Sequence, residues 1–120
     1  MGGKSFTLPC TITTNGFGTQ IHALCDLGAN GFAFMNTSFG YDLAKFHNLK
    51  ARRLPKVINI RGYNSEVGSI AIYYLRVNFT LNGRKFFNMP FILLDLGYYD
   101  LILGYIFFSY FNIVIDIVGR

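Results

Sequence analysis

Asp26 is the residue whose surroundings in the sequence most suggest chemistry. It follows the apolar stretch IHALC and opens a glycine-rich turn, Asp26-Leu27-Gly28-Ala29-Asn30-Gly31. A carboxylate at the end of a buried strand is costly unless it has hydrogen-bond partners or a catalytic role. It could therefore simply hold the amides of its own turn, or it could serve as an acid–base group. Paired acid–base catalysis needs a second carboxylate, and the sequence next to Asp26 does not supply one.

The other residues that commonly carry chemistry are few and scattered. Cys10 and Cys25 are too few for a disulfide scaffold or a zinc site, and both lie in apolar, strand-like stretches. We expect both to be buried free thiols. His22 and His47 have no metal-ligand spacing with each other or with the cysteines. The sequence thus predicts neither a metal site nor a cofactor.

The positive charge of the chain raises the question of nucleic acid. The formal net charge is +5, and the densest basic cluster is Lys50, Arg52, Arg53 and Lys56, which surrounds Pro55. No RNA-binding or helix-turn-helix motif accompanies this cluster. We therefore expect a solvated loop here, and we hold a basic nucleic-acid-binding β-barrel only as a third hypothesis.

Length and composition indicate one folded domain, residues 1–120. A 52% hydrophobic and 14% charged composition excludes a disordered chain. So much apolar content in a short chain predicts a partner chain. Residues 101–115 carry no charge, but they fall short of the ~20 residues that span a bilayer, and we expect a core segment. Met1 to Pro9 lacks the apolar run of a secretory signal, from which we expect an intracellular, cytoplasmic protein.

The elements that would position Asp26 are mostly short strands. Alternating apolar residues and Asn-Gly turns predict strands, whereas residues 39, 43 and 46 predict one apolar helix face. A one-residue slip in the apolar phase predicts a bulge near Tyr74-Leu75. We expect a mobile hairpin tip at residues 62–68. The predicted strands are residues 6–14, 19–25, 32–35, 57–61, 70–80, 86–94, 101–103 and 113–118, and the predicted helices are residues 37–47, with Asn36 or Thr37 as the cap, and 106–111.

Several motifs, in this order, resemble the retropepsin-like aspartic proteases of retroviruses and LTR retrotransposons, the gypsy-type elements of fungi above all. The resemblance covers residues 6–118. Its landmarks are the Asp26–Gly31 turn, the helix at 37–49, Leu54-Pro55 leading into Ile60-Arg61-Gly62-Tyr63, Leu101-Ile102-Leu103-Gly104, Phe107-Phe108 and Ile115-Asp116-Ile117. A second Asp-Leu-Gly, at Asp95-Leu96-Gly97, has a different context, and we expect a structural turn there.

This resemblance implies a mainly β, closed-barrel acid-protease fold with one or two short helices and a core of about residues 6–118. It also implies an aspartic endopeptidase of a retrotransposon polyprotein. Its active site would form in a homodimer, with Asp26 as the catalytic residue of each subunit. Gly28, Ala29, Asn30, Gly62 and Tyr63 would bind an extended peptide substrate. No metal is implied, and nucleic acid and membrane partners are disfavoured.

Leu27 departs from the family pattern, which has Thr or Ser at that position. The family's hydroxyl bonds to the matching turn of the partner subunit, and a leucine can neither donate nor accept such a bond. The alternative function is therefore a catalytically impaired retropepsin fold that serves as a dimerisation or peptide-binding module.

Overall fold

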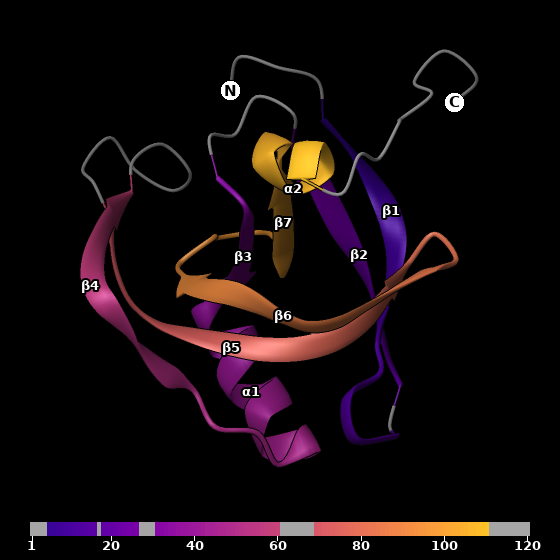
Figure 1. The fold of residues 1–120 in the computed structure, drawn as a ribbon, viewed down its shortest axis with the longest axis horizontal. Helices are drawn as coiled ribbons and strands as arrows, with labels where there is room; N and C mark the ends of the chain where they lie inside the picture. The colour runs from indigo at the N-terminus through magenta and orange to yellow at the C-terminus, as the bar shows by residue number, and fades with distance from the viewer. Residues whose placement is uncertain (1–4, 17, 27–30, 61–68, 111–120) are drawn as a thin grey trace.

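Six strands of the chain close into a β-barrel. The computed structural model describes residues 5–16, 18–26, 31–60 and 69–110 (Figure 1). The described strands are β1 (Ser5–Ile12), β2 (Thr19–Asp26), β3 (Ala33–Asn36), β4 (Arg52–Ile60), β5 (Ser69–Leu81), β6 (Arg84–Leu94) and β7 (Leu101–Gly104). They form one sheet in the order β1-β2-β7-β3-β6-β5-β4, and a further pairing of β1 with β5 closes the ring and leaves β4 outside it. This confirms the predicted mainly β, closed-barrel fold.

Two Asn-Gly pairs make the turns that the sequence predicts. The backbone φ angles are 56° and 82° at Asn15 and Gly16, and 49° and 87° at Asn82 and Gly83. Asn and Gly tolerate such positive angles better than other residues do. The first pair lies in a short 3-10 turn (Thr14–Gly16) between β1 and β2, and the second joins β5 to β6.

The short strand β7 lies between two strands that are far from it in sequence. It pairs in parallel with β2 and antiparallel with β3. The carboxyl end of β2 and the beginning of β3 therefore lie on either side of the same end of β7. Helix α2 (Tyr105–Tyr110) begins directly after that end.

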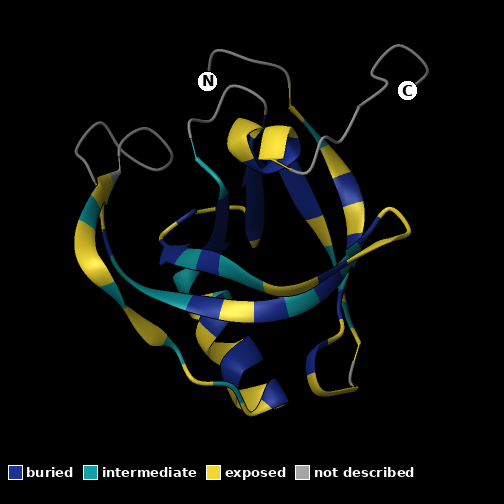
Figure 2. Ribbon diagram, in the orientation of Figure 1, coloured by how far each residue is buried: buried dark blue, intermediate teal, exposed yellow. Residues whose placement is uncertain are grey.

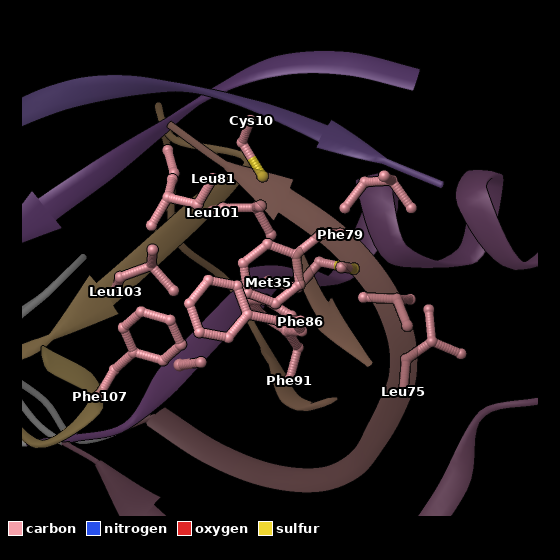
Figure 3. Close-up of a cluster of buried hydrophobic side chains, with 14 of the residues drawn as sticks. Cys10, Met35, Leu75, Phe79, Leu81, Phe86, Phe91, Leu101, Leu103 and Phe107 are labelled. Carbon is pink, nitrogen blue, oxygen red and sulfur yellow. The ribbon is translucent and has the colours of Figure 1, made fainter. Parts of the chain in front are cut away.

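Aromatic rings fill much of the barrel interior (Figure 3). Phe79 stacks on Phe86 with ring centroids 4.9 Å apart, and Phe91 meets Phe79 edge-on at 5.4 Å. Phe107 of α2 packs against Phe86 at 5.3 Å. Strand β7 and all of β3 except Asn36 are buried, whereas β4 is largely exposed (Figure 2). The rings thus connect the barrel core to α2.

Helix α1 (Thr37–His47) begins and ends where the sequence predicts, but its buried face differs. Asn36 is the N-cap, and Asn48 ends the helix with a left-handed φ of 55°. Phe46, which we expected to face the core, is 62% exposed, whereas His47 is buried. The face that packs inward is Gly40, Leu43, Ala44 and His47, because His47 finds hydrogen-bond partners inside the fold.

Two predictions about β4 and β5 are wrong in detail. The basic residues from Arg52 onward belong to β4 rather than to a loop, although they are exposed as expected. Pro55 is tolerated because β4 is an edge strand. Pairing of β5 with β6 runs unbroken through Tyr74 and Leu75, and its irregularity lies between Val77 and Phe79. A second irregularity lies in β4, between Arg53 and Ile58.

The second Asp-Leu-Gly forms a structural turn, as predicted. Gly97 has a φ of 64°, and its N–H donates to Asp95 Oδ1 at 3.0 Å. Leu96 is buried, and its N–H donates to Asn36 Oδ1 at 2.9 Å.

The uncharged segment before residue 111 folds as β7 and α2. In the described ranges no helix is long and apolar enough to cross a membrane. The predicted hairpin tip at residues 62–68 and the predicted strand at 113–118 lie outside the described residues.

Candidate active site

Asp26 is the last residue of β2, and its side chain is fully buried. It lies opposite Ser5 in the antiparallel pairing with β1 and opposite Gly104 in the parallel pairing with β7. The backbone of Asp26 is thus held on both sides by strand pairing. Burying a carboxylate is costly, and proteins commonly accept that cost at functional sites.

The end of β7 lies between Asp26 and Phe32 and contacts the backbone of both. The N–H of Gly104 donates to the carbonyl of Phe32 at 3.0 Å, and the N–H of Ile106 donates to the carbonyl of Gly31 at 3.3 Å. Asp26 lies on one side of β7, and Phe32 is held on the other. Pairing with Gly104 holds Asp26, at the start of the predicted catalytic turn. The hydrogen bonds to the carbonyls of Gly31 and Phe32 hold the end of that turn.

Aromatic packing, in addition to these backbone hydrogen bonds, holds Phe32 in place. Its ring meets Phe107 edge-on at 5.5 Å and Tyr110 at 5.9 Å. Phe107 is fully buried and belongs to the same cluster as Phe79 and Phe86. In the sequence, Phe107-Phe108 is only a family landmark, with no predicted connection to the site. The signal available was its distance of three residues from Gly104.

The remaining predicted site residues are not placed by the structure. Gly28, Ala29 and Asn30, and also Gly62 and Tyr63, lie outside the described residues. Of the predicted set, only Asp26 therefore has an observed position, and Gly104 is the neighbour that the structure assigns to it.

A cavity of about 350 Å³ opens next to Phe32. Its walls come from Phe32, from the start of β3 and from residues of β4, β5 and β6, and they are mainly apolar. Sequence patterns do not reveal this cavity, because its walls come from residues far apart in the chain. The described residues that line it are Phe32, Ala33, Leu54, Pro55, Tyr74, Arg76, Pro90 and Ile92.

Both cysteines and His47 belong to the buried interior of the fold. Cys10 and Cys25 are both buried, and desolvation by burial raises the pKa of Cys10 to about 12. His47 Nδ1 donates to the Thr14 carbonyl at 2.7 Å, and its Nε2 lies 3.2 Å from Thr19 Oγ1. Over the described ranges, no three His, Cys, Asp or Glu side chains gather closely enough to hold a metal ion.

Comparison with known proteins bears on the fold alone. No family model matches the sequence, and no curated protein matches it. Eleven chains of solved structures do match. One is the retroviral protease-like domain of Ddi1 from Leishmania major, which is 22% identical with a TM-score of 0.63 and is aligned over 95% of this chain and 82% of that chain. The barrel is therefore a retropepsin-like fold.

Proposed function

We propose that this chain is an aspartic endopeptidase of the retropepsin type, which hydrolyses peptide bonds of a retrotransposon polyprotein as a homodimer. The observation that carries the proposal is the buried carboxylate of Asp26 beside Gly104, at the end of a strand in a retropepsin-like barrel. The likeness in fold supports the class of protein, and the position of Asp26 supports its chemistry.

The reaction needs two carboxylates that share one proton. Two like charges a few ångströms apart do not readily both ionise, so the pair titrates in two separate steps. The ionised carboxylate takes a proton from a water molecule, which attacks the peptide carbonyl carbon. The protonated carboxylic acid donates its proton to the carbonyl oxygen. Such an enzyme therefore works in mildly acidic solution, where one proton remains on the pair.

A homodimer would supply the second carboxylate. A two-fold axis next to Asp26 would bring the two copies of this residue together. The surface of α2 supports a partner on this side, because this helix begins directly after Gly104 and is largely exposed (Figure 2). Its exposed apolar side chains are Tyr105, Ile106 and Tyr110. Covering such side chains removes apolar area from water and favours association.

Leu27 supports a second candidate function, a dimerisation or peptide-binding module of low catalytic activity. The missing hydroxyl would leave backbone groups of the partner's turn unsatisfied, at about 1–3 kcal/mol each and twice per dimer. A displacement of ~1 Å at the reacting groups can cost roughly 100-fold in rate.

Peptide cleavage by the wild-type chain and by Asp26→Asn tests the proposal. We expect the wild-type chain to cleave hydrophobic peptides at mildly acidic pH, with inhibition by a statine-type transition-state analogue, and Asp26→Asn to be inactive. Asp95→Asn is the matched control, because Asp95 begins the same Asp-Leu-Gly tripeptide in an exposed structural turn. Equal turnover by the wild-type chain and Asp26→Asn would refute the enzyme and leave the binding module.

The variant Leu27→Thr separates the two candidates further. If the leucine weakens the dimer, threonine should raise both the dimer affinity, measured by sedimentation, and the rate of cleavage. An unchanged affinity together with an unchanged rate would show that residue 27 does not limit this protein.

A further inference from the structure

The cavity shares Phe32 with the backbone that surrounds Asp26. Phe32 forms one wall, and its carbonyl accepts a hydrogen bond from Gly104, the residue opposite Asp26. The cavity is small, at the low end of the roughly 300–1,000 Å³ that is usual for ligand sites. An extended peptide presents alternate side chains to one face, so a cavity of this kind suits one or two of them.

Arg76 gives this mainly apolar cavity a cationic edge. Tyr74 and Arg76 of β5 pair with Ile92 and Pro90 of β6, and these four side chains line the cavity together. The guanidinium carbon lies 5.6 Å from the centre of the Tyr74 ring, and Nη1 donates to the Asn88 carbonyl at 3.0 Å. A guanidinium has five N–H donors, so most of them remain available to a ligand.

The three strands around Arg76 carry charge of one sign. The described residues of β4, β5 and β6 include no Asp or Glu, so no carboxylate on these strands competes for the guanidinium. Fields from neighbouring cations add, which favours a negative group at this edge and opposes a positive one. The basic residues of these strands are Arg52, Arg53, Lys56, Arg76, Arg84 and Lys85.

We propose that this cavity selects an acidic side chain next to an apolar one in the bound peptide, with Arg76 as the receptor for the carboxylate. The apolar walls at Leu54, Pro90 and Ile92 hold the neighbouring aliphatic or aromatic group. Arg76 is thus a specificity-determining residue, and Asp26 remains the residue that acts on the peptide bond. The inference rests on the proposed peptide-binding function, and it does not require turnover.

Binding of labelled peptides to the full-length Asp26→Asn variant tests the inference, because this variant binds without cleaving. The probes are fluorescein-labelled decapeptides with two apolar residues at the centre and one Leu-Glu pair moved a single position at a time. Matched sets carry Leu-Gln or Leu-Lys. By fluorescence anisotropy we expect Glu to bind about two- to fivefold tighter than Gln, at one position of the pair only, as for a partly exposed ion pair.

Substitutions at Arg76 and Arg84 show whether the preference arises at the cavity. We expect Arg76→Gln to abolish the preference for Glu, and Arg76→Glu to reverse it in favour of Lys. Arg84→Gln is the matched control, since Arg84 lies over the Phe86 ring at 5.1 Å and does not line the cavity. That variant should keep the preference for Glu, and far-UV circular dichroism should show all three variants folded.

The remaining outcomes separate this inference from the proposed function. An Arg76-dependent preference for Glu in a chain that cleaves no peptide would refute the protease and leave the cavity assignment standing. Cleavage with equal binding of Glu and Gln at every position would refute the cavity assignment alone. The absence of any peptide binding would refute both. A different result would also overturn the inference in favour of nucleic acid: the chain binds a uridine 20-mer with a steep salt dependence, and Arg76→Gln abolishes that binding.

Discussion

Phe107 should be the residue on which both the barrel core and the candidate site most depend. It is fully buried, and its ring lies between Phe32, next to the site, and Phe86 in the barrel interior, at centroid distances of 5.5 Å and 5.3 Å. Phe108 meets it edge-on at 5.3 Å. Replacing this ring by a methyl group would leave a cavity bordered by other aromatic rings, which cannot all move inward to fill it.

The expected loss is large compared with the stability of a small domain. Truncation of a buried Phe to Ala typically costs about 3–5 kcal/mol, from lost burial and from the remaining cavity. Whole domains are stable by only about 5–15 kcal/mol. The variant Phe107→Leu keeps most of the apolar volume and should lose about 1–1.5 kcal/mol. We therefore expect Phe107→Ala to be marginally folded and Phe107→Leu to be folded.

Urea denaturation followed by far-UV circular dichroism measures these losses. With an m-value of roughly 1.5 kcal/mol per molar, the midpoint should fall by about 2–3 M in Phe107→Ala. All variants must be compared at one protein concentration, because any dimerisation adds to the apparent stability. Phe87→Ala is the control: Phe87 is 68% exposed and its loss should stay within about 0.5 kcal/mol. A loss below about 1 kcal/mol for Phe107→Ala would contradict the packing described for α2.

Two further predictions concern buried polar groups. His47→Leu removes the donor to the Thr14 carbonyl and the contact with Thr19 Oγ1, so the free energy of unfolding should fall by about 1–3 kcal/mol in thermal or urea denaturation; His47→Leu as stable as the wild-type chain would show that these contacts contribute little. Burial raises the pKa of Cys10 from 9.0 to about 12 in the folded chain, so the unfolded chain loses this proton first as the pH rises. The stability that the protonated Cys10 thiol contributes is complete below pH 9 and is lost between about pH 9 and pH 12. The free energy of unfolding should therefore fall less steeply with pH in Cys10→Ala than in the wild-type chain. Identical slopes in the wild-type chain and in Cys10→Ala would contradict the assigned burial.

The turns and most strand boundaries could be predicted because local chemistry determines them. Asn15-Gly16 and Asn82-Gly83 take positive φ angles that few other residues accept, so the hairpins follow from the sequence alone. The buried face of α1 could not be predicted in the same way. His47 is polar, and its burial is favoured by contacts with Thr14 and Thr19, about thirty residues away in the sequence. Phe46 is correspondingly left in solvent.

The candidate site could likewise be predicted only in part from the sequence. Asp26 is recognisable because an apolar strand and a glycine-rich turn lie on either side of it in the sequence. Its neighbour Gly104 is 78 positions away, and only the insertion of β7 between β2 and β3 brings them together. Resemblance to a family named both segments as landmarks without pairing them. Hydrophobic periodicity could not pair them either, because it describes single strands and not their order in the sheet.

Arg76 shows what a charge in a strand can mean once the sheet order is known. It is the one charged residue in β5, and from the sequence it is simply a solvent-facing side chain. The pairing of β5 with β6 places Pro90 and Ile92 beside it, and β4 adds Leu54, so the same residue becomes the polar edge of an apolar cavity. The basic residues of β4 gain their significance in the same way, because a field needs several charges on one sheet. Substrate selection by this barrel would then depend on strands remote in sequence from Asp26, which could change by mutation without disturbing the buried carboxylate.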